Sequence, residues 1–272
     1  MLTEPAVGVQ HPPAERKHAQ ELEVERVYIL NLPPARFPSS LSIMNSRALF
    51  FFVVAAIVPL LPARADSLTR REALKIAETY VQYRWSASTK NLRHGRDSAG
   101  VEIHTPDRGT GRGNPDADCW TLETENTGVA YKWGGYDTPG TFAAGVRAGK
   151  AAGDIYTTEK RRLGGAGVSG DAVGIDCSGF VSRCWRLEKR QSTSTLASIC
   201  RPLGSTSELR PADVMNTANG HVLLFVKWLD DDRRRALFYE AAPFSKTRST
   251  ERDLAELLAA GYQPLRYRQI VD

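Results

Sequence analysis

Residues 174–181 constrain the fold more than any other part of the chain, because they place a cysteine where an apolar stretch passes into a helix. Asp176 and Ser178 flank Cys177, and both residue types cap helix N-termini. The apolar residues that follow recur at the spacing of a buried helical stripe, at Phe180, Val181 and Trp185. The sequence therefore predicts a helix that begins at the cysteine and extends to about Lys189.

The position of Cys177 bears on the chemistry of its thiol. The first N–H groups of a helix are unpaired and carry a partial positive charge, so they favour a thiolate over a thiol. A free cysteine has a pKa of roughly 8.5, and a neighbouring histidine lowers such a value further. Residue type alone favours a buried structural cysteine, so the interpretation of Cys177 as a nucleophile needs support from the rest of the chain.

Two apolar segments after residue 220 predict a β-hairpin. Residues 221–228 and 236–241 are the two segments, and the charged stretch 230–235 between them is typical of a turn. A helix that carries the cysteine, followed by consecutive strands, favours an α+β fold in which that helix packs on an antiparallel sheet.

Local patterns predict the remaining elements. Thr69 and Glu72 form a capping-box pattern that opens an amphipathic helix. Thr250 is a candidate cap of a later helix that Gly261 ends. The other predicted elements are a short strand near 101–103 within the irregular segment 86–118, helices at 141–149 and 195–200, and a last strand at 265–271.

His221 and Glu240 lie at the same end of the predicted hairpin. Strands that pair about a turn at 230–231 place the two residues opposite each other, within hydrogen-bonding reach. Together with Cys177 they supply a nucleophile, a base and a group that orients the base. In this hypothesis His221 takes the thiol proton and returns it to the leaving amine, and the backbone N–H of Cys177 or Ser178 holds the oxyanion.

The beginning of the chain predicts export. Residues 48–61 form an apolar run of about 14 residues, shorter than the roughly 20 that a transmembrane helix needs. Met44 and Arg47 precede this run, and a small-residue cleavage site that ends at Ala65 follows it, as in a secretory signal. We expect a periplasmic, cell-envelope or secreted protein that has no stable membrane anchor after cleavage.

The same pattern divides the chain. We expect an extension at 1–43 that is either mis-assigned or disordered, a signal peptide at 44–65, an N-terminal helix and loop region at 66–126, and a catalytic domain at 127–272.

The four cysteines, Cys119, Cys177, Cys184 and Cys200, all follow the signal. In an oxidising compartment they could form disulfides. If Cys177 stays reduced, at most one bridge forms; we favour Cys184 with Cys200, and pairings with Cys119 stay open. Cys177 and Cys184 lie about two helical turns apart, too far to bridge.

Composition and spacing bear on partners. The cysteine and histidine spacings do not resemble a zinc framework, and we expect neither a metal nor a cofactor. His94 and His104 lack a carboxylate or cysteine at ligand spacing, so we expect both to be solvated.

The formal net charge of +5 suits an anionic polymer. Aromatic residues do not interleave with a basic stripe, so we expect no nucleic-acid partner.

Four motifs, in this order along the chain, resemble those of one family. They are Tyr131-x-Trp133-Gly134-Gly135, Asp176-Cys177-Ser178-Gly179-Phe180-Val181, Leu209-x-Pro211-x-Asp213 and His221-Val222. The second motif is the most specific, and the set resembles the NlpC-type cell-wall peptidases. These are papain-like cysteine hydrolases that cut peptidoglycan stem peptides, typically after D-glutamate. The resemblance covers residues 127–242.

The resemblance implies roles for particular residues. It makes Cys177 the nucleophile and His221 the base, and it places Glu240 at a third polar position where many members have histidine. The substrate-site positions of some members fall on Tyr131, Asp176 and Ser178, of which the aspartate holds a stem-peptide amine.

The chain departs from the family pattern at two places near the cysteine. An insertion at about 136–172 separates the first two motifs, which implies a reshaped or lidded substrate groove. Ala212 replaces the usual glycine of a turn. Both departures concern the substrate rather than the reaction.

The sequence leads to one expected function and several alternatives. We expect a secreted cysteine hydrolase that cleaves stem peptides as a γ-D-glutamyl endopeptidase does. An N-acetylmuramoyl-L-alanine amidase or an acyltransferase would use the same residues on the same fold. The alternative from another class is a catalytically idle wall-binding protein.

Overall fold

The computed structural model describes residues 67–108 and 118–272, which belong to the unit Leu60–Asp272. The predicted extension and the predicted signal peptide lie outside the described residues. Within the described part of the chain, no helix has the length and apolar character needed to cross a membrane.

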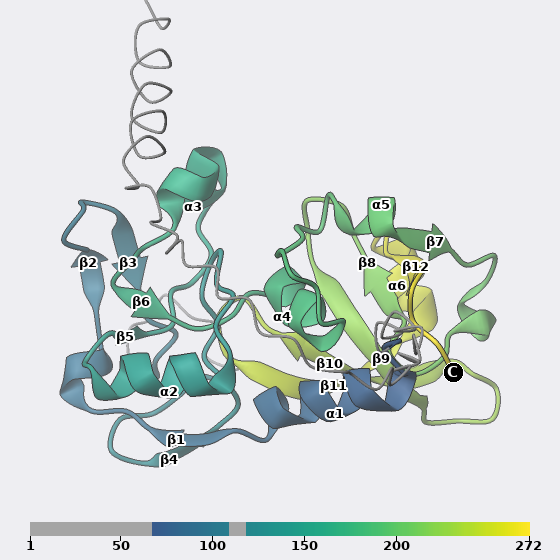
Figure 1. The fold of residues 1–272 in the computed structure, drawn as a ribbon, viewed down its shortest axis with the longest axis horizontal. Helices are drawn as coiled ribbons and strands as arrows, with labels where there is room; N and C mark the ends of the chain where they lie inside the picture. Colours follow the sequence, from purple (N-terminus) through teal and green to yellow (C-terminus); the bar gives the residue numbers. More distant parts are fainter. Residues whose placement is uncertain (1–66, 109–117) are drawn as a thin grey trace, which may run out of the picture. The chain divides into compact units, whose positions relative to one another are not determined.

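Six strands of the C-terminal part of the chain form one antiparallel sheet (Figure 1). Its strands follow the order β11-β10-β9-β8-β12-β7. Their bounds are β7 Cys200–Pro202, β8 Val214–Asn216, β9 Val222–Trp228, β10 Arg235–Ala241, β11 Thr247–Asp253 and β12 Gln263–Tyr267. The combination of helices with an antiparallel sheet agrees with the α+β class that the sequence predicts.

Alternate residues of β9 are buried on the two faces of the sheet, as the two-residue period of a strand requires. Val222 and Leu224 belong to the core that contains helix α4 (Cys177–Cys184). Leu223 and Phe225 belong to a second core that contains helix α6 (Leu254–Ala259). Both faces of the sheet are therefore covered, which explains the nearly continuous apolar run in this strand.

Helix α4 begins at the cysteine, as predicted, but it is shorter than predicted. Asp176 is its N-cap and accepts a hydrogen bond from the backbone N–H of Gly179 at 2.6 Å. The helix ends at Cys184 rather than near Lys189, because Arg186 takes the left-handed conformation with φ 52°. A residue in that conformation stops an α-helix.

Helix α1 (Arg70–Val81) packs against α4 (Figure 1). The predicted capping box is present, with Thr69 as N-cap and Glu72 bonding back to it. Tyr80 meets Phe180 edge to face, with ring centroids 5.7 Å apart. The chain continues into β1 (Arg84–Ser86), which pairs with β4 (Glu125–Thr127).

The segment 86–118 contains more regular structure than predicted. A 3-10 turn η1 (Thr89–Asn91) precedes a hairpin of β2 (His94–Arg96) and β3 (Glu102–His104). His94 lies 2.9 Å from Asp107 and His104 lies 2.8 Å from Glu102 through their Nε2 atoms. The expectation of a solvated histidine was wrong for His104, which is buried, and His94 is exposed although it contacts a carboxylate.

The insertion at 136–172 folds into short elements. These are α2 (Pro139–Arg147), β5 (Ala151–Ala152), α3 (Thr158–Leu163), the 3-10 turn η2 (Gly164–Gly167) and β6 (Ala172–Val173). A buried ion pair between Lys160 and Asp154 ties α3 to the chain before it. Because both side chains are almost fully buried, α3 has a fixed position rather than that of a free surface loop.

The last part of the chain differs from the prediction. Thr250 lies in strand β11, opposite Phe238 of β10, and it caps no helix. The N-cap of α6 is Asp253, which accepts hydrogen bonds from the backbone N–H groups of Ala255 and Glu256. The short α5 (Leu196–Ile199) lies within its predicted range, whereas β12 begins two residues before the predicted strand at 265–271 and already ends at Tyr267.

All four cysteines are free thiols, so the predicted Cys184–Cys200 bridge is absent from the structure. The thiols of Cys184 and Cys200 are both buried and belong to one apolar core. Burial raises the pKa of Cys184 well above its ordinary value and raises that of Cys200 to about 12.

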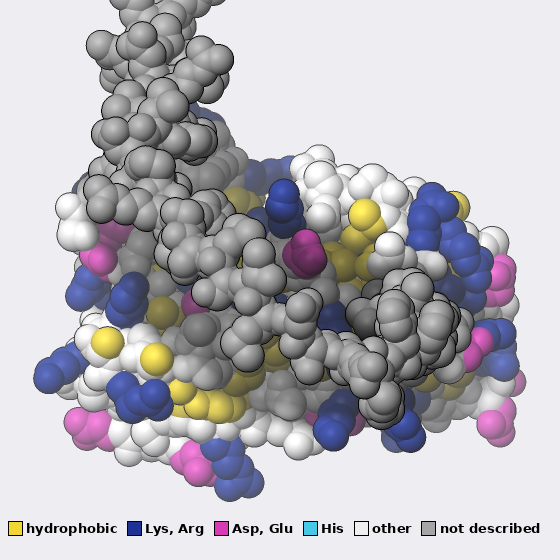
Figure 2. Space-filling view, viewed as in Figure 1, with side chains coloured by type: hydrophobic (Ala, Val, Ile, Leu, Met, Phe, Trp, Pro, Cys, Tyr) yellow, Lys and Arg dark blue, Asp and Glu magenta, His cyan; other side chains and the backbone are white. Residues whose placement is uncertain are grey.

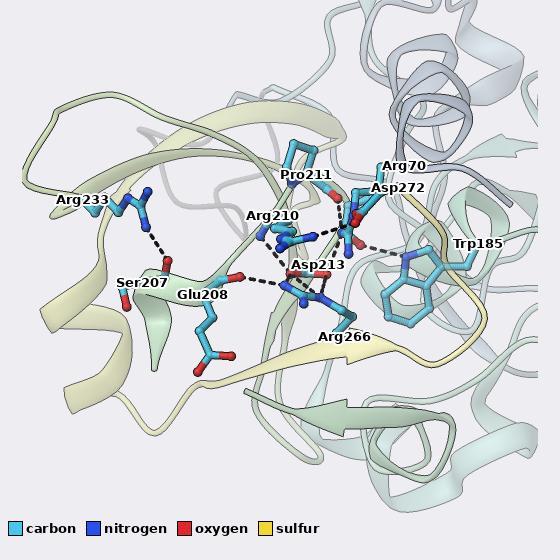
Figure 3. Close-up of polar contacts among 11 residues, drawn as sticks. Arg70, Trp185, Ser207, Glu208, Arg210, Pro211, Asp213, Arg233, Arg266 and Asp272 are labelled. Atoms are coloured by element: carbon cyan, nitrogen blue, oxygen red, sulfur yellow. Dashed lines mark hydrogen bonds and ion pairs between the residues drawn. The ribbon is translucent and has the colours of Figure 1, made fainter. Parts of the chain in front are cut away.

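Asp213 forms the centre of a polar network that joins distant parts of the chain (Figure 3). Its fully buried carboxylate pairs with Arg266 of β12 at 2.6 Å and with Arg70 of α1 at 2.9 Å. It also accepts the backbone N–H of Arg210 at 2.9 Å. Asp213 is the last residue of the third motif, and its contacts fix the turn that precedes β8. Ala212 lies in this turn and takes the left-handed conformation, with φ 67°.

Candidate active site

Cys177 lies in the first turn of α4, with only 7% of its surface exposed. The backbone N–H groups of Cys177 and Ser178 have no hydrogen-bond partner among the described residues. The unpaired N–H groups and the helix dipole favour negative charge at this position. The helix start therefore leaves two backbone donors beside the sulfur that can hold an anion.

His221 lies immediately before β9, in a turn that fixes its backbone. Its N–H donates to the hydroxyl of Thr217 at 2.9 Å, and its carbonyl accepts the N–H of Thr217 at 2.9 Å. Asn219 supplies the left-handed residue of this turn, with φ 57°, which asparagine tolerates better than most residues. The imidazole therefore extends from a backbone position that these hydrogen bonds fix at the start of β9.

His221 and Glu240 make the hydrogen bond that the hairpin predicts, between Nε2 and Oε2 at 2.7 Å. The predicted register was wrong, however. Tyr239 pairs with Leu224, and the ladder shifts at a bulge between Leu237 and Phe238. The ladder therefore places Glu240 diagonal to His221 rather than opposite it, and the two long side chains bridge the offset.

Two arginines of β11 hold the Glu240 carboxylate from its other side. Arg248 lies 3.0 Å and Arg252 lies 3.3 Å from Oε1. Burial alone raises the pKa of this carboxyl, but the hydrogen bond and charge of His221 and the two arginines outweigh burial and lower it to about 2. Glu240 is therefore ionised, and both of its oxygens are held.

The electrostatics of His221 link it to Cys177. Burial alone lowers the pKa of His221, but the charge and hydrogen bonding of Cys177, and after them those of Glu240, raise it to about 10. The Nδ1 atom is buried and has no hydrogen-bond partner of ordinary geometry within the described residues. With Nε2 engaged by Glu240, Nδ1 is the atom left to exchange a proton with the thiol.

A cavity of about 410 Å³ opens onto Cys177 and His221. Aromatic side chains form part of its wall, at Tyr131, Trp133, Tyr156 and Phe244. Hydroxyl and amide side chains form another part, at Ser192, Thr193, Ser194 and Asn219. Asp176, Ser178, Arg161 and Arg190 complete the charged and polar lining. The volume and the mixed lining suit a ligand of several residues or a small molecule.

Tyr131, Asp176 and Ser178 all line this cavity. Tyr131 is buried, and its strand-like bridge with Ile175 fixes it beside the cysteine turn. Burial, then the charges of Cys177 and Asp176, raise its pKa well above the ordinary value.

Both carboxylate oxygens of Asp176 are already engaged. Oδ1 accepts from the N–H of Gly179 and from the hydroxyl of Ser178 at 3.1 Å, and Oδ2 forms an ion pair with Arg190. Neither Arg190 nor the arginines on Glu240 were singled out from the sequence. Each is an ordinary charged residue in its local context, and only the tertiary fold brings it to the site.

The part of the chain that the structure describes contains no group of three His, Cys, Asp or Glu side chains arranged to hold a metal ion. Lys and Arg side chains are interspersed with Asp and Glu on the face shown in Figure 2. Cys177 and His221 line the cavity with a thiol and an imidazole, and the Glu240 carboxylate is hydrogen-bonded to that imidazole from outside the lining.

The chain matches no family model, no curated protein and no solved structure. Its chemistry must therefore be inferred from the geometry of the site and from its motifs.

The raised pKa of His221 predicts how a reaction that uses this imidazole would depend on pH. The imidazolium persists as pH rises until about 10, and the Glu240 carboxylate, with a pKa of about 2, stays ionised throughout. We expect kcat/KM for a soluble substrate to remain high above neutral pH and to fall only as pH approaches 10. An alkaline limb near 6.5, the ordinary value for histidine, would contradict this arrangement.

A variant of Glu240 tests the cause of that profile. Glu240→Gln keeps the shape of the side chain but removes its charge, so we expect the alkaline limb to move towards lower pH and kcat/KM to fall about tenfold or more. Glu251→Gln is the matched control, because Glu251 lies on β11 in an exposed pair with Arg235. The control should leave the profile unchanged.

Proposed function

We propose that this protein is a secreted or periplasmic cysteine hydrolase with a papain-like fold that cleaves peptide or amide bonds in peptidoglycan stem peptides. The bond that we favour follows a γ-linked D-glutamate. One observation carries the proposal: His221, hydrogen-bonded to Glu240, lines the same cavity as Cys177, whose charge acts on the same imidazole. The ordered motifs from Tyr131 to His221 support the choice of substrate.

The residues suffice for a two-step hydrolysis. The Cys177 sulfur attacks the carbonyl carbon of the scissile bond, and the proton held by His221 passes to the leaving nitrogen, which yields a thioester and a free amine. The imidazole then takes a proton from water, whose oxygen attacks the thioester. Collapse releases the new carboxyl product and returns the proton to the catalytic pair.

The developing oxyanion has suitable partners in both steps. The unpaired backbone N–H groups of Cys177 and Ser178 are oriented by the helix rather than by a mobile side chain. Preorganised donors of this kind stabilise a tetrahedral intermediate without reorganisation during the reaction. Glu240, held by Arg248 and Arg252, keeps the imidazole in one tautomer and orientation.

Incubation with a purified disaccharide–tetrapeptide tests the proposal, with mass spectrometry of the products. Cleavage after D-glutamate should leave a dipeptide on the sugar and release the rest of the stem. Release of the whole stem peptide would indicate an amidase, and a product joined to an added amine would indicate an acyltransferase. No product, together with tight binding to the polymer, would overturn the assignment as an enzyme.

A further inference from the structure

We infer that Arg190 and Arg161 form a carboxylate-binding subsite beside the nucleophile, so that the substrate carries a free carboxylate on the residue next to the scissile bond. The inference rests on the proposed function for the identity of the peptide. The anion preference of the cavity itself can be measured without it.

Arg190 places unused donors next to the nucleophile. One guanidinium nitrogen, Nη2, pairs with Asp176 and lies 3.4 Å from the hydroxyl of Ser178. These residues flank Cys177 on its two sides. The Nε and Nη1 atoms of Arg190 make no hydrogen bond within the described residues, and a third of the side chain is exposed. A guanidinium has five N–H donors in a planar fork that matches a carboxylate.

Arg161 adds a second positive charge from another element. It lies on α3, in the insertion, and lines the same cavity. Its exposed side chain has no ion-pair or hydrogen-bond partner among residues 67–108 and 118–272. The buried Lys160–Asp154 pair fixes α3, and so it fixes the backbone position from which Arg161 extends.

The charges of the cavity favour an anion over a cation. The Cys177–His221 pair has no net charge whichever of the two side chains carries the shared proton, and Asp176 is matched by Arg190. Arg161 is then left with an unbalanced positive charge. A substrate amine that approached Asp176 would have to displace Arg190 and leave that guanidinium unpaired, whereas a carboxylate can bind Arg190 without breaking the existing ion pair.

The position of Arg190 indicates which carboxylate it binds. Its guanidinium contacts the residues before and after the nucleophile, so it can reach only a group close to the scissile bond. In a γ-linked glutamyl peptide, the α-carboxylate belongs to the residue whose side-chain carbonyl is attacked. We therefore expect the enzyme to distinguish γ-glutamyl peptides with a free α-carboxylate from those in which it is amidated.

A matched pair of peptides tests this specificity. The two soluble stem peptides differ only in a free α-carboxylate or an α-amide on the γ-linked glutamate. We expect the carboxylate form to have a kcat/KM about tenfold to hundredfold higher, the factor that a hydrogen bond to a charged group contributes. Equal rates for the two forms would overturn the inference.

Three variants separate the contributions of the arginines. Arg161→Gln and Arg190→Gln should each reduce the preference, while Arg190→Lys should retain part of it. Arg161→Gln disrupts no contact of the folded protein, so a change in that variant does not arise from misfolding. Arg147→Gln is the control, because Arg147 is an exposed arginine of α2 that does not line the cavity. An unchanged preference in both glutamine variants would overturn the inference.

Thiol alkylation gives a readout that does not depend on the proposed function. Iodoacetate and iodoacetamide react with the same sulfur but differ in charge. The ratio of interest is the rate of iodoacetate divided by the rate of iodoacetamide at Cys177. We expect this ratio to fall severalfold in Arg161→Gln and Arg190→Gln relative to the unmodified protein and to Arg147→Gln. If neither peptide is cleaved but the ratio falls, the proposed function fails and the anion subsite stands. An unchanged ratio would overturn the subsite.

Discussion

Replacement of Cys177 with alanine should abolish hydrolysis, with a loss of at least about 10⁴-fold, because nucleophile and base act as one unit. No other side chain that lines the cavity next to His221 can form a thioester. The fold should be retained, since the change removes one sulfur atom at a helix start. Release of product from the disaccharide–tetrapeptide measures activity, and thermal unfolding measures the fold.

A second cysteine supplies the matched control. Cys119 is a half-buried free thiol that lines another hollow of the surface, whose lining does not include His221. Cys119→Ala should therefore hydrolyse the substrate at the unmodified rate. Full activity in Cys177→Ala, or loss of activity in Cys119→Ala, would show that the nucleophile has been assigned wrongly.

Replacement of Asp213 with alanine should lower the free energy of unfolding by about 3–5 kcal/mol, the cost of leaving a buried charge without its partner. Asp213 is fully buried, and its removal leaves the Arg266 guanidinium and the Arg70 side chain without their shared carboxylate (Figure 3). These arginines join β12 and α1 to the turn before β8. Denaturant unfolding measures the loss.

Asp272 is the control for that network. It pairs with Arg70 and Arg210, but its side chain is 68% exposed. Exposed ion pairs contribute about 0–1 kcal/mol, so Asp272→Ala should change the unfolding free energy little. Comparable losses in the two aspartate variants would mean that burial does not determine the contribution of Asp213.

The parts of the fold that the sequence predicts are those specified by nearby residues. Asp176, at the N-cap, and the apolar residues after Cys177 determine where α4 begins, and all of them lie within one or two turns. The capping box of Thr69 and Glu72 does the same for α1. The contact between His221 and Glu240 follows from the hairpin, because a contact between long side chains tolerates an error in register.

The parts that the sequence misses depend on contacts between distant residues. Strand β11 is polar and alternates weakly, so Thr250 looks like a cap; only pairing with β10 makes it a strand. The bulge after Leu237 has no local signature. Arg190, Arg248 and Arg252 were missed because an arginine that pairs with a carboxylate of the candidate site looks the same in sequence as one on the surface.

Titration of the thiol together with activity tests the central claim most directly. The protein is treated with less than one equivalent of iodoacetamide, the alkylated cysteine is located by peptide mapping, and hydrolysis of the disaccharide–tetrapeptide is measured on the same sample. We predict that Cys177 is labelled first and that activity falls in proportion to its labelling. Undiminished hydrolysis by protein that is fully alkylated at Cys177 would contradict the account.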